Sequence, residues 1–113
     1  MTEHGAIVQS IKAAKAEDRT LNNMIRVPLG SPDDDSFQVR FSSHLPAQIM
    51  FHSYGANFKI NYHYDEEPTR VFELTPNGHK TLIAPKGAKS FFAKISDVTI
   101  IKPKIASVMA TFR

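Results

Sequence analysis

The stretch AQIMFHSYGANFKINYHY, residues 47–64, decides the fold class of this chain. Apolar side chains occupy every second position on both sides of Gly55, which is the period of a half-buried β-strand. With residues 54–57 as a four-residue loop, Phe51 faces Ile60 and Ile49 faces Tyr62. The stretch therefore predicts an antiparallel hairpin with one apolar face and one mostly polar face.

The same period continues outward along the chain. Turn-forming residues separate most of the resulting strand candidates, which are residues 37–42, 47–53, 57–64, 70–74, 80–84, 90–95, 97–102 and 105–112. With residues 65–69 as the next loop, Tyr62 faces Phe72, and residues 47–74 are expected to form a three-stranded meander. Seven to eight short strands predict an all-β fold, an antiparallel β-sandwich or jelly-roll-like domain.

Residues 1–30 differ from the rest and are predicted to form an N-terminal arm or short amphipathic helix, ahead of a β-sandwich domain at 31–113. Apolar residues recur there at helical spacing, but a helix of about three turns is marginal alone in water. Its apolar residues are therefore predicted to contact neighbouring subunits: Ile7, Val8, Ile11, Met24 and Ile25. The alternative is a self-contained monomer whose helix packs on its own sheet.

The 113 residues suffice for one domain, and 42% of them are hydrophobic, which is typical of a globular chain. The absence of cysteine excludes disulfides, thiolate metal sites and a cysteine nucleophile. It favours an intracellular protein, or one that is stabilised by assembly. With neither 18 consecutive apolar residues nor a signal-peptide pattern, no membrane partner is expected.

No pattern of residues in the sequence predicts catalysis. The chain has no G-x-S-x-G motif and no phosphate-binding glycine loop, and many of its acidic residues cluster in two turns, 33–35 and 65–67. His52 and His63 would share the polar face of the hairpin roughly 13 Å apart, which is too far to share a metal ion. We therefore expect no catalytic residues, no metal site and no cofactor, and a chain that is not an enzyme.

The net charge is unevenly distributed along the chain. Residues 31–79 carry three basic and seven acidic side chains (−4), whereas residues 80–113 carry seven basic and one acidic (+6). Five lysines form a predicted patch for an acidic partner or nucleic acid: Lys86, Lys89, Lys94, Lys102 and Lys104. Only one of Phe91 and Phe92 can point inward, so the other is expected at an interface.

The last third of the chain resembles the ending of small β-sandwich virion proteins of bacteriophages. The residues concerned are 81–92 (TLIAPKGAKSFF), 95–102 (ISDVTIIK) and 106–108 (ASV). The resemblance implies a structural subunit without a cofactor, in a capsid vertex, a decoration layer or a tail. Its partners would be other virion subunits in a homo-oligomer.

From these features the predicted function is a non-catalytic structural subunit of a larger assembly, a phage capsid or virion-associated protein located in the virion. The alternative is a small β-barrel protein, in the cytoplasm, that binds single-stranded nucleic acid through the basic last third. A third class is a carbohydrate- or receptor-binding module that uses loop aromatics such as Tyr54.

Overall fold

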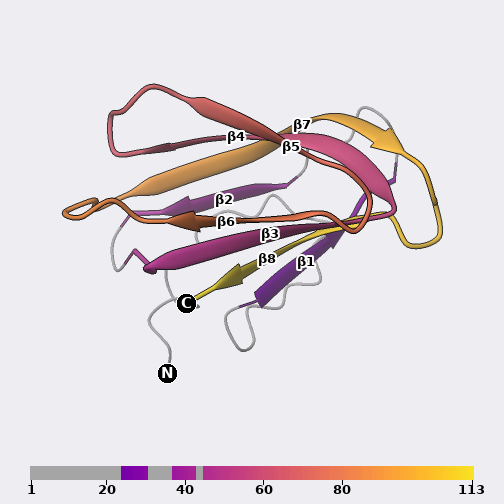
Figure 1. Ribbon diagram of the computed structural model, residues 1–113, viewed down its shortest axis with the longest axis horizontal. Coiled ribbons are helices and arrows are strands. Elements are labelled where there is room, and N and C mark those ends of the chain that lie inside the picture. Colours follow the sequence, from indigo (N-terminus) through magenta and orange to yellow (C-terminus); the bar gives the residue numbers. More distant parts are fainter. Residues whose placement is uncertain (1–23, 31–36, 43–44) are drawn as a thin grey trace.

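The computed structural model describes residues 24–30, 37–42 and 45–113, and this part of the chain contains eight β-strands and no helix (Figure 1). The strands are β1 (Met24–Pro28), β2 (Gln38–Phe41), β3 (Gln48–Tyr54), β4 (Ala56–Tyr64), β5 (Arg70–Leu74), β6 (His79–Ile83), β7 (Phe91–Ile100) and β8 (Ser107–Phe112). All their pairings are antiparallel. The all-β antiparallel fold predicted from the sequence is confirmed.

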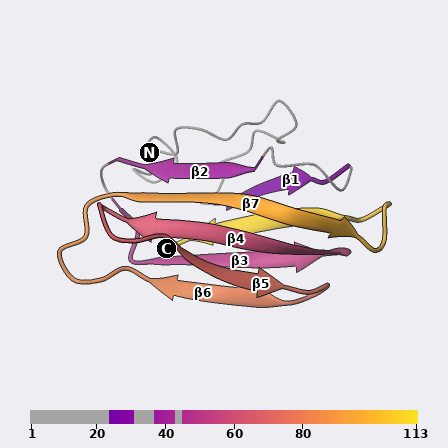
Figure 2. The ribbon, with the colours of Figure 1, turned by 90° about the horizontal axis from the view of Figure 1, so that it is seen from above.

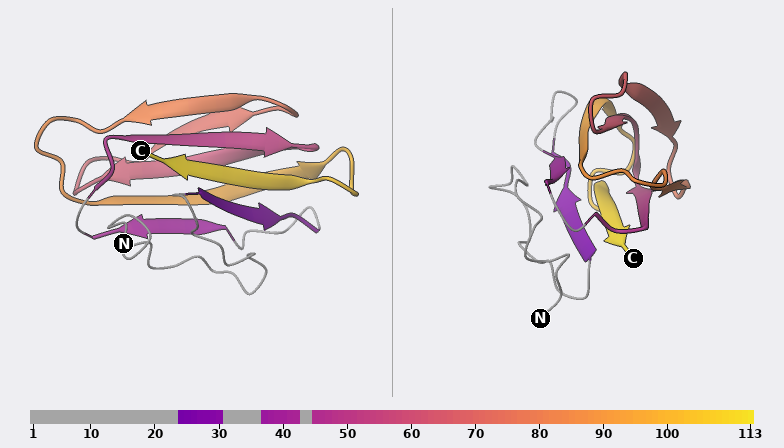
Figure 3. Two further views of the ribbon diagram at one scale, coloured as in Figure 1. Left: turned by 90° about the horizontal axis from the view of Figure 1, so that it is seen from below. Right: turned by 90° about the vertical axis from the view of Figure 1, so that its left-hand side faces the viewer.

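The strands form two sheets that pack face to face. The first sheet has the order β1-β8-β3-β6 and the second the order β2-β7-β4-β5. The chain changes sheet at every connection except the one between β4 and β5, and this arrangement is that of an eight-stranded jelly roll. Figures 2 and 3 show the two layers from other directions.

The space between the sheets is filled by aromatic and aliphatic side chains. Six phenylalanines are fully buried there: Phe37, Phe41, Phe51, Phe58, Phe91 and Phe112. The rings of Phe41 on β2 and Phe112 on β8 meet nearly perpendicularly, with their centroids 5.1 Å apart. Because such edge-to-face pairs add about 0.5–1.5 kcal/mol to the burial of their surface, they help to hold the two sheets together.

The step from β3 to β4 differs from the predicted hairpin. β3 pairs with β6 and β8, whereas β4 pairs with β5 and β7, so the chain crosses between sheets at Gly55. Gly55 has a φ of 65°, and its carbonyl accepts hydrogen bonds from the N–H groups of Ile101 (2.9 Å) and Lys102 (2.8 Å). The predicted meander is wrong at this point, because a sheet crossing and a hairpin both direct the apolar faces of the two strands to one interior.

The pairing of β4 with β5 was predicted, but its register differs by two residues. Ile60 faces Phe72 and Tyr62 faces Arg70. The last residues of β4, His63 and Tyr64, pair with β7. Residues 63–69 therefore lie beyond the last β4–β5 pair, whereas the predicted register left only residues 65–69 between the strands.

β7 replaces two predicted strands, 90–95 and 97–102. The register between β4 and β7 shifts between Asn57 and Lys59, where Asp97 has a φ of 54°. This is a β-bulge, in which one strand inserts a residue that bends it without ending it. The two predicted strands are therefore one strand, which continues through the bulge.

β1 corrects the predicted domain boundary. Residues 24–28, assigned to the arm, pair with β8 from Met24↔Thr111 to Pro28↔Ser107. Ile25 is 1% exposed in the core of its own domain, so it is not available to a neighbouring chain, and Met24 is exposed. The other predicted contacts, Ile7, Val8 and Ile11, lie outside the described residues.

The side of the sandwich formed by the edge strands β5 and β6 carries two charges on its inner faces. Lys80 faces the same way as the buried Phe51, and Arg70 faces the same way as Tyr62, yet both charged residues are exposed. Inward-pointing charges on edge strands are a common device against pairing with another sheet edge. Pairing of another sheet edge with β5 or β6 is therefore disfavoured.

Asp65, in the connection after β4, forms hydrogen bonds with residues just before β7. Its Oδ1 accepts hydrogen bonds from the backbone N–H groups of Lys89 (3.1 Å) and Ser90 (3.0 Å), and from the Ser90 hydroxyl (3.2 Å). These hydrogen bonds favour the ionised carboxylate and lower the pKa of Asp65 below 3.8. The bond from the Lys89 N–H has the largest effect.

Acidification is therefore expected to remove stability that depends on Asp65. A carboxyl group with a lower pKa in the folded than in the unfolded chain stabilises the fold above the unfolded pKa, and this stabilisation disappears as the pH falls through the folded pKa. We expect the urea midpoint to fall between about pH 5 and about pH 2, and to fall less in Asp65→Asn. Equal decreases in the variant and the wild type would contradict this role.

Candidate functional site

The outer face of the second sheet, meaning the side chains of β2, β7, β4 and β5 that point away from the core, carries one partly exposed aromatic ring. Phe91 is 1% exposed in the core, whereas the adjacent Phe92 points outward and is half-buried. The expectation that only one of these two rings is inward is confirmed. Phe92 is thus the phenylalanine side chain that this face offers to a ligand, near the start of the inner strand β7.

Two rows of side chains cross this face next to one another. In the first row, Phe92 lies between Arg40 on β2 and His63 on β4. The Arg40 guanidinium carbon is 4.8 Å from the centroid of the Phe92 ring, and the His63 ring is 5.9 Å from it. In the second row, Lys94 lies between Gln38 and Asn61. An aromatic ring therefore adjoins cations and amides.

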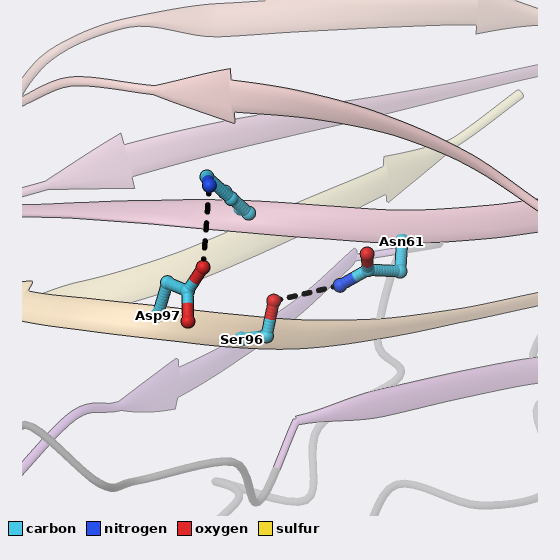
Figure 4. A network of polar contacts seen from close by, with 4 residues as sticks. Asn61, Ser96 and Asp97 are labelled. Carbon is cyan, nitrogen blue, oxygen red and sulfur yellow. Dashed lines mark hydrogen bonds and ion pairs between the residues drawn. The ribbon is translucent and has the colours of Figure 1, made fainter.

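Polar contacts fix the neighbouring part of the face (Figure 4). The Asn61 side-chain N–H donates to the Ser96 hydroxyl at 2.7 Å, and Lys59 forms an ion pair of 3.3 Å with Asp97 at the bulge. Because the Asn61 amide nitrogen is engaged with Ser96, the orientation of its carbonyl oxygen is set as well. That oxygen is an acceptor for a ligand.

A pocket of ≈ 310 Å³ opens between these rows, lined by Asn61, His63, Thr69, Phe92 and Lys94. His63 Nδ1 lies 2.9 Å from the backbone oxygen of Asp65. Since a carbonyl oxygen only accepts, Nδ1 carries the hydrogen, and Nε2 of the neutral ring is an acceptor. The pocket thus combines one ammonium group, hydrogen-bonding groups and an aromatic wall.

The predicted lysine patch is not one surface. Lys86 and Lys89 precede β7, whereas Lys102 and Lys104 follow it, at the opposite end of the sandwich (Figures 1 and 2). A strand of ten residues separates the two pairs by about 30 Å. Only Lys94, of these five exposed lysines, lies on the outer face of the second sheet.

Sequence reasoning missed most of the residues around Lys94. Arg40, Asn61, His63 and Thr69 come from three separate regions of the chain. Their convergence depends on the pairing of β7 with β2 and β4, which are not adjacent to it in sequence. The only signal available was the Phe91–Phe92 pair, which required one ring to point outward.

The described residues contain no group of three or more His, Asp or Glu side chains placed to hold a metal ion. His52 and His63, predicted to share a face, lie in different sheets. Tyr54, considered as a loop aromatic, is the last residue of β3. Within the same ranges, the chain has no helix long and apolar enough to cross a membrane.

No family model matches this chain, and no curated protein matches its sequence. Among solved structures, PirA matches with a TM-score of 0.53 and 8% identity, over 86% of this chain and 99% of that chain. The cupin domain of Drosophila melanogaster CENP-C matches with a TM-score of 0.49 and 10% identity, over 80% of this chain and 58% of that chain. At these identities the likeness shows the fold alone, that of a jelly-roll β-sandwich.

One comparison corrects the expectation that the chain is not an enzyme. Hydroxypropylphosphonic acid epoxidase from S. wedmorenis matches with a TM-score of 0.43 and 14% identity, over 80% of this chain. The matched region is 41% of the epoxidase chain, so this chain spans well under half of that protein. An enzyme is thus among the structural matches, and the lack of a short catalytic motif does not exclude catalysis. The match itself assigns no activity.

Proposed function

We propose that the domain binds single-stranded nucleic acid through the outer face of the second sheet. The observation that carries this proposal is the position of Phe92, between the guanidinium of Arg40 and the imidazole of His63 and beside Lys94. Aromatic rings among cations on a sheet suit this ligand, because bases stack on the rings while phosphates meet the cations.

The residues of the pocket supply the remaining contacts. Lys94 and Arg40 are exposed and attract phosphate groups, and a base stacks on the Phe92 ring or on the guanidinium plane. Asn61 and His63 offer acceptors to the base edge from positions fixed by their own hydrogen bonds. The opposite charges of Lys59 and Asp97 offset each other, so this ion pair contributes little attraction for nucleic acid.

Fluorescence anisotropy with a labelled oligonucleotide of about 15 thymidines tests the proposal. We expect Phe92→Ala to weaken binding about tenfold, since stacking contributes about 1–3 kcal/mol per base. Lys94→Ala should weaken binding and reduce the slope of log K against log salt by about 1. Lys104→Ala removes the same charge at the end of the sandwich and should leave both quantities nearly unchanged.

Two results would overturn this function. One is the absence of binding at low salt, where phosphate contacts are strongest. The other is equal weakening by Lys94→Ala and Lys104→Ala, which would show attraction by net charge without a defined face.

The virion role stays a prediction. The described residues and the structural matches do not test it. Because residues 24–28 form β1 and Ile25 lies in the core, any truncation that probes the predicted arm has to leave this strand in place.

A further inference from the structure

A pair of histidines lies on the outer face of the first sheet, on the opposite side of the sandwich from the proposed nucleic-acid site. His52 on β3 and His79 on β6 face each other directly in the register, and their ring centroids are 5.7 Å apart. The N–H of Ser53 bonds to the oxygen of Gly78 and the N–H of Ala84 to the oxygen of Ala47. By alternation, His52 and His79 form a non-hydrogen-bonded pair, where side chains approach most closely.

The orientation of His52 is fixed by a stack of side chains. Its ring lies parallel to that of Tyr54, with an interplanar angle of 4° and centroids 4.6 Å apart. The guanidinium carbon of Arg26 is 4.6 Å from the Tyr54 centroid, and Arg26 Nε donates to the hydroxyl of the buried Ser107 at 3.0 Å. The structure shows neither histidine ring hydrogen-bonded to another described residue, so their nitrogens are open to a ligand.

From this juxtaposition we infer that His52 and His79 bind one divalent transition-metal ion, such as Zn²⁺, Ni²⁺ or Cu²⁺, with water at its other positions. A Zn–N bond is about 2.0–2.1 Å, and the ring centre lies roughly 1 Å beyond the nitrogen. Two imidazoles on one ion at a near-tetrahedral angle therefore have centroids roughly 5–6 Å apart, which includes the observed 5.7 Å. Imidazole suits these three ions.

Metal binding requires the neutral form of an imidazole, in which a ring nitrogen offers a lone pair to the ion. With two protein ligands, the site is exchangeable and differs from closed structural zinc sites with four.

Isothermal titration of the full chain with ZnCl₂ and NiCl₂ tests the inference. We expect His52→Ala and His79→Ala each to weaken binding at least about tenfold, because even indirect changes around metal ligands cost about 10–100-fold. His63→Ala removes a histidine from the other sheet, so its affinity for Zn²⁺ and Ni²⁺ should equal that of the chain with all three described histidines. These titrations use a His4→Ala/His44→Ala background, since both residues lie outside the described ranges.

A second measurement needs no change at the site. Cu²⁺ added to the wild-type chain should broaden the NMR signals of Tyr54, Thr81 and Met109 before those of the opposite sheet, because these residues adjoin the pair. Undiminished binding in both His52→Ala and His79→Ala would overturn the inference, as would broadening centred on His63. Loss of nucleic-acid binding by Phe92→Ala has no bearing on either readout, so the two proposals fail separately.

Discussion

Phe91→Ala is expected to lower the free energy of unfolding by about 3–5 kcal/mol, the usual cost of emptying a phenylalanine site in a core. Phe91 is 1% exposed, and its ring centroid lies 5.0 Å from that of Tyr64 and 6.1 Å from that of Tyr62. Its removal leaves a cavity next to two large rings that cannot both move into it. Urea unfolding followed by circular dichroism measures the loss.

Phe92→Ala is the matched control, because it deletes the same side chain from the next residue on the opposite face of β7. The deletion removes a half-buried ring and its contact with Arg40, so we expect a loss of about 1 kcal/mol. Similar losses in the two variants would mean that the inner and outer faces of β7 are wrongly assigned. The same stability measurement tests whether any loss of nucleic-acid binding in Phe92→Ala is caused by unfolding.

Gly55→Ala is the second substitution for which we expect a large effect, about 2–4 kcal/mol of destabilisation. The φ of 65° is unfavourable for a residue with a Cβ atom. In addition, that Cβ would lie 2.9 Å from the backbone oxygen of Lys102 and 2.9 Å from Cγ1 of Ile105. Relief of these contacts has to displace the loop between β7 and β8, which Gly55 itself holds through two hydrogen bonds.

Gly87→Ala separates the cost of the positive φ from the cost of the close contacts made by the added Cβ atom. Gly87 has a φ of 87°, but nothing lies within 4 Å of the position that its Cβ would take. Only the conformational cost remains, and we expect about 1–2 kcal/mol from thermal or urea unfolding. If Gly55→Ala costs no more than Gly87→Ala, the close contact at the sheet crossing is not a source of specificity for this fold.

The alternation of apolar residues was sufficient to predict which side of β3 and of β4 faces the core. Phe51, Phe58 and Ile60 are all completely buried, as the period of two requires. It was not sufficient to assign the strands to sheets, because both inner faces of a sandwich are apolar. The partners of β7 depend on contacts between distant parts of the chain, which no local pattern contains.

The candidate site shows the same limit. The outward ring of the Phe91–Phe92 pair could be inferred, although not which of the two it is. Five lysines close together in the sequence suggested one patch, but an extended strand carries its flanking loops to opposite ends of the molecule. Conversely, Arg40 and His63 adjoin Phe92 although they are far from it in sequence.

The inward-pointing Lys80 and Arg70 have a consequence for crowded solutions. To extend the sheet of one copy with the free strand of another at this side, an ammonium or guanidinium group would have to lose hydration water beside a row of hydrocarbon side chains. Growth of fibres by strand addition is thereby penalised at every step. Contact between copies is thereby directed to the remaining surfaces, which are the edge strands β1 and β2 and the broad faces of the two sheets.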